Sequence, residues 1–483
     1  MSRRALLCAS LLLAGLLLAA GCAVNPATGK RQLSLVSESQ EIEMGRQADR
    51  LIEAQMGLYG SAALQDYVQS IGDRLAAVSE RPDLDWTFRV VDDSSVNAFA
   101  LPGGYIYVTR GIIAHLNTEA ELATVIGHEI GHVTARHSVN QMSKAQLAQL
   151  GLGLGMVLSP EAAQQFGGYA EMGVGVMFLK FGRDDERQAD DLGLRYMVAA
   201  NYDARPAPQV FEMLGRVSRS SGADRLPGWL STHPAPENRE ADLERKIASL
   251  EHDFGGSKRG RQEYLAYIDG IVFGADPREG YFKESRFYHP KMEFRFDFPE
   301  GWKTFNGREA VIAKNPQADA FVRVTLSSER TPSQALERFS DQQDVRAGSS
   351  WRADVHGYPV SSRWFAAETS KGPGRGVVAY LRHGDNVYEL LGFALESRWD
   401  TDGGKLERSV ASFDRLTDPA ALSVEPARLR VVEPSSAMTL ARFADRYDAT
   451  VPIEALSLIN NVEVSSSLLA GHPYKVVQGG RLP

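Results

Sequence analysis

Three residues in one short segment of the chain have the types and the spacing needed for metal-assisted hydrolysis. His128, Glu129 and His132 lie within Thr118–His137, which reads TEAELATVIGHEIGHVTARH. The two histidines are one helical turn apart, so both imidazoles can hold one ion, and imidazole nitrogen suits zinc. Glu129 is too close in sequence to be a comfortable third ligand, but it can reach a water molecule on the metal. The alternative is a buried helix whose histidines hydrogen-bond to their surroundings.

The helix that must carry these residues has its own start signal. Thr118 and Glu121 form a capping box, in which side chains satisfy the first free backbone N–H groups. The positions before the histidines are almost all apolar, so we expect this helix to be mostly buried. On a helix that extends to His137, the last histidine lies about 180° around from His128. We therefore predict that His137 is a structural or surface histidine and not a ligand.

Two histidines leave such a site short of the three protein ligands that are typical of catalytic zinc. The segment Phe178–Ala200 is strongly helical in its second half, and there Glu186 and Asp190 are one turn apart on one face. Alone, this pair is most often a solvated acidic face. Beside the two histidines, Glu186 is the candidate third ligand of one zinc ion per chain. Asp190 is the candidate acceptor for the free N–H of a ligand histidine, which would fix its tautomer.

The motifs occur in an order that resembles a known family. The chain is similar to the zinc metallopeptidases that include the CAAX prenyl endopeptidase, HtpX and the periplasmic BepA-type proteases, from about Ser37 to Leu250. One departure is Gly182, where many relatives have Ser. Four motifs carry the resemblance: Asn97-Ala98-Phe99-Ala100 with Pro102-Gly103-Gly104, His128-Glu129-Ile130-Gly131-His132 with Arg136-His137, Arg183-x-x-Glu186-x-x-Ala189-Asp190, and Ser231-Thr232-His233-Pro234 with Arg239.

This resemblance implies roles for the site residues. It implies three zinc ligands: His128, His132 and Glu186. It implies that Glu129 is the catalytic acid/base, and it adds three residues that line the cleft: Asn97, His233 and Arg239. Zinc and one of the last two would stabilise the oxyanion. In periplasmic relatives, the histidine that matches His233 can also cap the zinc and hold the enzyme inactive. Without the family, His233 would be a lone histidine in a proline-bounded loop, which is more often a surface residue.

A predicted hairpin comes directly before the histidine helix. Two β-rich runs flank Pro102-Gly103-Gly104 within Ser95–Thr109, as expected of two strands joined by a turn. In zinc peptidases, an edge strand beside the metal helix pairs with the extended substrate, a case of β-augmentation. One strand of this hairpin is the candidate for that role.

The N-terminus has the pattern of a targeting segment. Arg3 and Arg4 precede the uncharged apolar run Ala5–Ala20, and small residues then lead to Cys22. Residues 1–22 resemble a bacterial lipoprotein signal, which implies a lipid on Cys22; the alternative is a simple membrane anchor. Ala23 stands where an aspartate would retain the protein at the inner membrane. The resemblance therefore implies an outer-membrane lipoprotein in the bacterial envelope that faces the periplasm.

The whole chain reads as a multidomain α+β protein. We expect a tether at 23–36, a mainly helical zincin-like peptidase domain with a small β-sheet at 37–250, and a linker at 251–262. An α+β domain with an antiparallel sheet is expected at 263–418. Within the peptidase domain, the apolar stretches 145–158 and 167–179 are predicted to be core helices, with a mobile lid as the alternative.

The tail, residues 425–483, has a strand–helix–helix–strand order. Leu429–Val432 and Tyr474–Val477 would pair, with helices at Thr439–Tyr447 and Ile453–Asn460. This order resembles a degenerate LysM module, the peptidoglycan-binding fold, so the tail could contact peptidoglycan. A structural cap is the alternative.

These observations predict a lipid-anchored zinc endopeptidase that cuts misfolded or stalled envelope proteins. The alternatives are a proteolytically restrained chaperone or assembly factor for outer-membrane proteins, and a peptidoglycan-associated binding protein. The formal charge of −8, with no basic run that carries interleaved aromatics, argues against a nucleic-acid partner.

Overall fold

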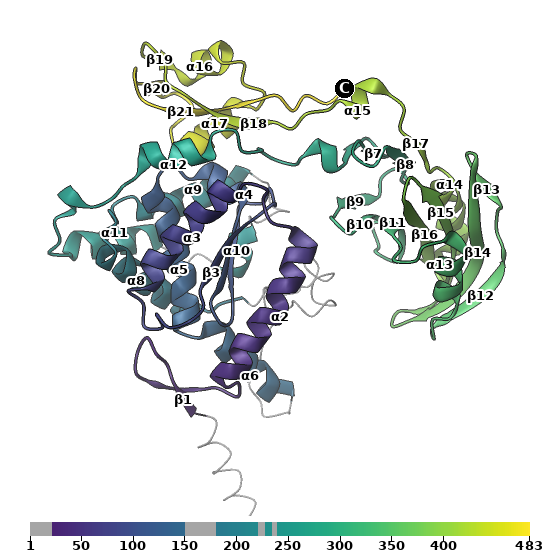
Figure 1. Ribbon diagram of the computed structural model, residues 1–483, viewed down its shortest axis with the longest axis horizontal. Helices are drawn as coiled ribbons and strands as arrows, with labels where there is room; N and C mark the ends of the chain where they lie inside the picture. The colour runs from purple at the N-terminus through teal and green to yellow at the C-terminus, as the bar shows by residue number, and fades with distance from the viewer. Residues whose placement is uncertain (1–21, 150–179, 221–227, 234–238) are drawn as a thin grey trace, which may run out of the picture. The chain divides into compact units, whose positions relative to one another are not determined.

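The computed structural model describes residues 22–149, 180–220, 228–233 and 239–483 (Figure 1). Contacts divide the chain into two compact units. Unit 1 runs through Gly274 and takes in Arg428–Gln478, whereas unit 2 comprises Ala275–Ala427 with Gly479–Pro483. The predicted signal peptide lies outside the described residues except for Cys22, and so do the predicted apolar helices except for 145–149. In the part of the chain that is described, no helix has the length and apolarity needed to cross a bilayer.

The centre of unit 1 is helix α5, Glu119–Thr134, and all of its residues are buried. Thr118 caps it as predicted, because its Oγ1 accepts from the N–H of Glu121 at 3.1 Å. The side chain of Glu121 accepts from the N–H of Asn117 instead of the N–H of Thr118. The prediction of one helix through His137 is wrong at its end, because α5 stops at Thr134 and Arg136 has a φ of +57°.

A three-stranded sheet packs beside α5. Its strands are β3, Thr87–Val91, β4, Ala98–Leu101, and β5, Tyr105–Thr109, in the order β3-β5-β4. Strands β4 and β5 form the predicted hairpin, whose turn uses Gly103 and Gly104 at φ of +83° and +101°. Strand β4 is therefore an edge of this sheet, and it lies against α5.

Further helices surround this centre, and α8 runs beside α5 in Figure 1. Ser37 caps α2 with a complete capping box, as its sequence suggests. The helices are α2, Glu38–Met56; α3, Ala62–Ala76; α4, Arg110–His115; α6, His137–Gln149; α8, Arg183–Ala199; α9, Ala207–Ser220; α10, Gly228–Thr232; α11, Arg239–Ser249; and α12, Arg261–Ile268.

The segment predicted as a linker, 251–262, is packed against the start of α5. The N–H groups of Glu119 and Ala120 donate to the carbonyls of Gly260 and Arg259. The buried carboxylate of Glu119 also accepts from Lys258 at 2.9 Å, and further hydrogen bonds reach it from three side chains: Tyr67, Arg74 and Tyr202. The boundary of the unit lies beyond this segment, at Gly274.

The tail contains the predicted strand, two helices and strand in that order, with a pair of two-residue strands added, β19, Met438–Thr439, and β20, Ser467–Leu468, and it is part of unit 1. Strand β18, Arg428–Val432, pairs with β21, Tyr474–Gln478, and between them lie α16, Leu440–Arg446, and α17, Ile453–Asn460. Lys475 of β21 is fully buried, and its Nζ donates to the carbonyls of Ala114 and Leu116 at 2.9 and 2.6 Å. Arg216 of α9 donates to Ser457 and to the carbonyl of Val462. The tail therefore packs on the helices that precede and flank α5.

Unit 2 has the expected α+β composition with antiparallel sheets. Its eight-stranded sheet has the order β12-β14-β15-β16-β11-β10-β9, with β13 paired to β14. A four-stranded sheet has the order β17-β8-β7-β6, with β6, Tyr281–Lys283; β7, Arg286–His289; β8, Phe294–Asp297; and β17, Asp414–Arg415. Helix α14, Trp399–Val410, packs into one apolar core and α13, Pro332–Ser340, into another. The strands of the large sheet are β9, Lys303–Asn306; β10, Ala310–Lys314; β11, Ala320–Leu326; β12, Val345–Ser350; β13, Asp354–Val355; β14, Tyr358–Thr369; β15, Gly372–His383; and β16, Asn386–Leu395.

Candidate metal centre

Four buried side chains of unit 1 converge on one point. Each offers one ligand atom, and these atoms all lie within 4.8 Å of one another. They are His128 and His132 from α5, Glu186 from α8 and His233 directly after α10. Two imidazoles and a carboxylate match the donor set of a catalytic zinc site, and a third imidazole lies where a fourth ligand would be. The residues therefore fit a zinc ion.

Glycines allow the helices that carry these groups to approach closely. A Cβ on Gly193 of α8 would lie 2.9 Å from the backbone N of His128, and a Cβ on Gly131 would lie 2.9 Å from the carbonyl O of Ala189. A side chain at either position would therefore force the two helices apart, and only glycine, which has no Cβ, fits there. The close crossing brings Glu186 to within 3.5 Å of both predicted histidine ligands.

Asp190 of α8 contacts His128, one of the predicted ligands. Its Oδ1 is 3.0 Å from Nδ1 of His128, so the Nε2 of that ring is left to face the group. Arg239 binds the same carboxylate through two nitrogens, at 2.6 and 2.5 Å, and also donates to Glu186 at 3.0 Å. Burial alone would raise the pKa of Asp190, but the charge of Arg239 and the hydrogen bond from His128 lower it to about 2.

Glu186 is also held as a carboxylate. Burial raises its pKa, and this is outweighed by the charges of His233, His128 and Arg239 and by the hydrogen bond with His233, so that the pKa is lowered overall. Glu129 is fully buried on α5, and its Oε1 accepts from Nε1 of Trp229 at 3.2 Å. Its Oε2 is buried with no hydrogen-bond partner in the described part of the chain. That oxygen is free to accept a proton or a water molecule.

The family model named Peptidase family M48 matches residues 62–247, which span all of these groups. The chain is 30% identical over 250 residues to the mitochondrial metalloendopeptidase OMA1 of Schizosaccharomyces pombe, a match of 47% of this chain and 70% of that protein. This chain belongs to peptidase family M48.

Other relatives of this M48 chain match over shorter shares of their length. It is 39% identical over 165 residues to the mitochondrial metalloendopeptidase OMA1 of Arabidopsis thaliana, covering 34% of this chain and 32% of the relative. It is 31% identical over 233 residues to the beta-barrel assembly-enhancing protease of Escherichia coli, covering 47% of each chain. The chain thus spans about a third of one relative and about half of the other.

His233 of the M48 domain is buried inside the group, whereas its sequence context alone suggested a surface loop. Its Nδ1 lies 3.0 Å from Glu186 and 3.3 Å from Nε2 of His128, and its Nε2 lies 3.6 Å from Oε1 of Glu129. Trp229, one turn earlier, stacks on the ring of His233 with centroids 4.7 Å apart. One short segment therefore contacts both the predicted ligands and the predicted base.

Two aromatic residues at the M48 site were not singled out from the sequence. Trp229 contacts Glu129 and His233, and the guanidinium of Arg239 lies 4.9 Å from its ring centroid. Phe181 stacks on His132 with centroids 4.0 Å apart. Buried aromatic residues are common core residues, so neither carries a local signal that separates it from the core; only the contacts reveal their place.

Asn97 is buried at the start of edge strand β4. Its backbone N–H donates to Oγ1 of Thr109 at 3.1 Å, and its side-chain Oδ1 has no hydrogen-bond partner in the described residues. The carbonyl of the preceding residue, Val96, accepts from the backbone N–H of Trp229. The structure therefore places Asn97 beside the segment that carries His233, and among the described residues its side chain makes no hydrogen bond with the four converging groups.

His137 is the residue for which the structure differs most from the helical-wheel prediction. It is buried, and its Nδ1 lies 2.9 Å from Nδ1 of His132. The prediction that it is not a ligand agrees with this geometry, but it is no surface residue. On an unbroken helix it would lie about 140° around from His132. The break at Arg136 returns it to the ring of His132.

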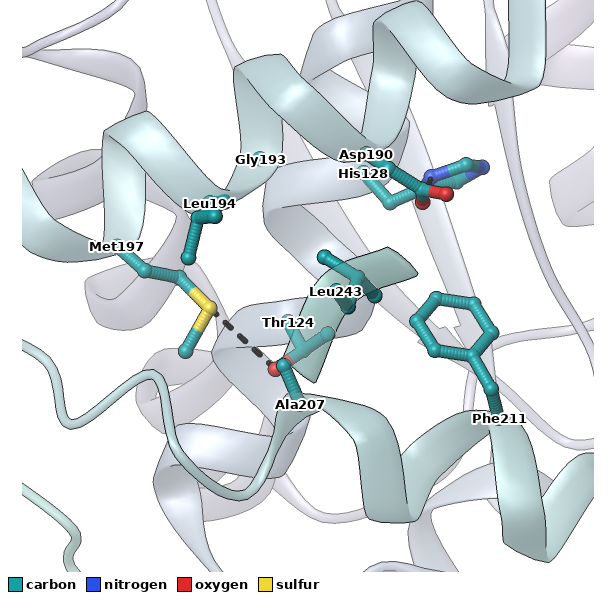
Figure 2. A pocket seen from close by; sticks show the side chains of 9 residues that line it. All are labelled: Thr124, His128, Asp190, Gly193, Leu194, Met197, Ala207, Phe211 and Leu243. Carbon is teal, nitrogen blue, oxygen red and sulfur yellow. Dashed lines mark hydrogen bonds and ion pairs between the residues drawn. The ribbon is translucent and has the colours of Figure 1, made fainter. Parts of the chain in front are cut away.

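A small cavity lies behind His128 and Asp190 of the M48 domain (Figure 2). Apolar side chains from α8, α9 and α11 line it, among them Met197, Phe211 and Leu243. Its volume is about 10 Å³, which is about enough for one water molecule. This cavity is therefore too small to accept a substrate side chain in this arrangement.

Proposed function

We propose that the protein is a zinc-dependent metalloendopeptidase, with His128, His132 and Glu186 as the zinc ligands and Glu129 as the catalytic base. The observation that carries the proposal is that Glu186, on a different helix, meets both imidazoles beside a buried Glu129. A solvated acidic face, the alternative for Glu186, is inconsistent with its complete burial.

The side chains suggest a division of labour in peptide hydrolysis. Bound zinc would polarise the scissile carbonyl and lower the pKa of a water molecule. Glu129 takes the proton of the attacking water through its partnerless Oε2 and returns it to the leaving amine. Asp190 holds His128 in the tautomer that leaves Nε2 free. Arg239, which binds Asp190 and Glu186, keeps both carboxylates ionised and in place.

We propose that the extended substrate pairs with strand β4. This strand is an edge of its sheet and lies against α5, so a peptide added there would pass beside Glu129. Asn97 would then meet the substrate, because its side-chain Oδ1 has no partner among the described residues and could accept from a peptide N–H.

We also propose that this arrangement is a restrained state. His233 fills the position of a fourth ligand. The indole N–H of Trp229 donates to Oε1 of Glu129, and its backbone N–H donates to the carbonyl of Val96. A substrate would need His233 to leave, after which either this histidine or Arg239 would assist the oxyanion. In the full chain, His233→Ala should raise proteolysis of casein at unchanged zinc content; a loss of proteolysis would instead give His233 a catalytic role.

We propose a lipid on Cys22 and a place at the outer membrane, facing the periplasm. The proposal rests on the charged start, the apolar run and the small residues before Cys22, with Ala23 after it. The relative in Escherichia coli is named a beta-barrel assembly-enhancing protease, so misfolded or stalled envelope proteins are the proposed substrates. A restrained chaperone or assembly factor for outer-membrane proteins is the second candidate, favoured by the closed position of His233.

The tail retains the LysM-like element order, so peptidoglycan contact through residues 425–483 stays a proposal. The packing of Lys475 and Arg216 favours the other reading of the tail, a structural part of the peptidase unit. Binding of the full chain to isolated sacculi, compared with a chain that lacks Leu429–Pro483, separates the two. Equal binding would refute a wall-binding tail.

The decisive test of the activity is Glu129→Gln in the full chain. We expect cleavage of casein and self-cleavage to be lost while one zinc ion per chain is retained, because the amide cannot accept the proton. The matched control is Glu244→Gln, an exposed glutamate of α11, which should leave both properties unchanged. Unchanged cleavage by Glu129→Gln would remove this residue from the mechanism.

A further inference from the structure

We propose that His137 is a positioning residue: with Gln188 it forms a hydrogen-bond relay that holds His132 in the tautomer that binds metal. The inference rests on the proposed function and extends it to two residues that are not ligands. It starts from a single contact, the 2.9 Å approach of Nδ1 of His137 to Nδ1 of His132.

The fold forces this contact. The break after α5 is fixed by side chains from the N-terminal part of the unit, because Arg136 donates to Glu41 at 2.8 Å and to the carbonyl of Val36 at 3.1 Å. The side chain of Asn25 donates to the carbonyl of Ala135 at 3.1 Å. Arg136 is thereby held at a φ of +57°, a conformation that non-glycine residues adopt only when their surroundings impose it. This backbone conformation directs the ring of the next residue, His137, towards the ring of His132.

The protons of the two rings can be placed from their partners. A hydrogen bond between two Nδ1 atoms requires that one ring carries the proton there and the other does not. Nε2 of His137 lies 3.1 Å from Oε1 of Gln188 and 3.8 Å from a carboxylate oxygen of Asp185. The amide oxygen of Gln188 is within hydrogen-bond distance and can only accept, and the Asp185 carboxylate adds negative charge nearby, so neutral His137 carries its proton on Nε2. Its Nδ1 is then a bare acceptor.

The direction of the relay follows. His132 must donate through Nδ1–H to His137, which leaves the lone pair of its Nε2 facing Glu186 and His128, at 3.5 and 3.0 Å. The opposite direction would put a proton on Nε2 of His132, the atom that the metal requires. Each predicted histidine ligand thus has its own orienting partner: Asp190 for His128 and His137 for His132. Such partners set the tautomer and the basicity of a ligand.

The first test measures the zinc dissociation constant of the full chain by chelator competition. His137→Phe keeps a ring but removes the acceptor, and we expect affinity to fall by about 10- to 100-fold. Gln188→Leu should also weaken zinc binding. Gln188→Glu keeps an acceptor, so its zinc affinity should stay within about two-fold of the wild-type value. The matched control is Gln141→Leu, because the side chain of this α6 glutamine donates to Asp185 at 3.1 Å.

If these side chains had only a structural role, zinc affinity would fall equally in Gln188→Leu and Gln141→Leu. Wild-type affinity in His137→Phe, or an equal fall in Gln188→Leu and Gln141→Leu, would overturn the relay. Absence of zinc binding by the wild type would overturn the proposed function and this inference together, whereas zinc binding that is indifferent to His137 would overturn the inference alone.

A second readout is measured on the wild-type chain, and a variant is needed only to assign one signal. In the zinc-loaded wild-type chain with ¹⁵N-labelled histidine, NMR should show His137 as the neutral tautomer with its proton on Nε2 and its Nδ1 unprotonated. The His137→Phe spectrum assigns the signal. A proton on Nδ1 of His137 would contradict the relay directly, because two N–H groups would then face each other.

Discussion

Replacement of Lys475 should loosen the segment from which the histidine helix begins. This lysine comes from the last strand of the tail, and it reaches carbonyls that lie 361 and 359 residues earlier in the chain. Those carbonyls, of Ala114 and Leu116, lie at the end of α4, just before the cap of α5. The ammonium also faces the buried carboxylate of Glu121. Lys475→Met would leave all three groups without their cation.

The expected loss is about 3 kcal/mol of unfolding free energy for this region, at the low end of the values for breaking a buried charged pair. Two buried carbonyls without donors account for most of it, at about 1 kcal/mol or more each. The loss stays at the low end because burial lowers the pKa of Lys475 well below its usual range, so the removed ammonium was itself unfavourable. Methionine also fills much of the same space.

Hydrogen exchange is the suitable assay, because it reports the opening of each segment separately. A loss of about 3 kcal/mol should reduce the protection of peptides from α4 and the first turn of α5 by about 100-fold. Peptides from unit 2 serve as the internal reference. The control is Lys246→Met, an exposed lysine of α11 that pairs with Asp191, for which less than about 1 kcal/mol is expected. A loss confined to the tail, or no larger than that of the control, would refute the reasoning.

Three further predictions test other parts of the structure. Burial is the main cause that lowers the pKa of His115 from 6.5 to about 4. As the pH falls, the unfolded chain binds a proton at this residue before the folded chain does, so this contribution to stability is fully present above pH 6.5 and is lost towards pH 4. After allowance for partial exposure of the ring, the free energy of unfolding should fall by about 2 kcal/mol over this range. Urea unfolding at pH 7.5 and 4.5 should show a loss of stability that is smaller by about this amount in His115→Phe than in the wild type. Gly193→Ala would push a Cβ against His128 and should reduce stability by about 1 to 3 kcal/mol with weaker zinc binding, whereas Gly215→Ala on α9 should be neutral or stabilising; equal effects in thermal melts would contradict the tight crossing. Removal of zinc by a chelator should stop proteolysis and lower the melting temperature of unit 1, and added zinc should restore both; a melting temperature indifferent to zinc would contradict a structural contribution of the metal.

Short-range patterns in the sequence were sufficient to single out three of the four side chains that converge in the candidate metal centre. The one-turn spacing of His128 and His132 predicted that both imidazoles face one point, and they do. The one-turn spacing of Glu186 and Asp190 predicted that both carboxylates lie on one face of a helix, and both contact His128. The Pro-Gly-Gly turn predicted a hairpin, which is present. In the tail, helix α17 has the predicted bounds. These features depend on residues within a few positions of one another, where periodicity and capping are decisive.

Features that depend on long-range contacts could not be read in this way. The helical-wheel argument that His137 is not a ligand assumed an unbroken helix. The break at Arg136 depends on its hydrogen bond with Glu41, which lies 95 residues earlier in the chain. Burial of His233 depends on its stacking against Trp229 and on contact with α8. Membership of the tail in unit 1 depends on Lys475. In each case the deciding partner lies in another segment, and one sequence carries no record of that pairing.

The order in which unit 1 is assembled has a consequence for biosynthesis. Its strand β21 is made more than two hundred residues after the last helix of the preceding segment, α12, because residues Ala275–Ala427 of unit 2 are encoded in between. Closure of such a distant contact comes late in folding. A nascent chain therefore lacks the contacts of Lys475 with the end of α4 until β21 has been synthesised. If the protein is an exported protease, as proposed, it would be incomplete until then and poorly able to digest its neighbours or itself.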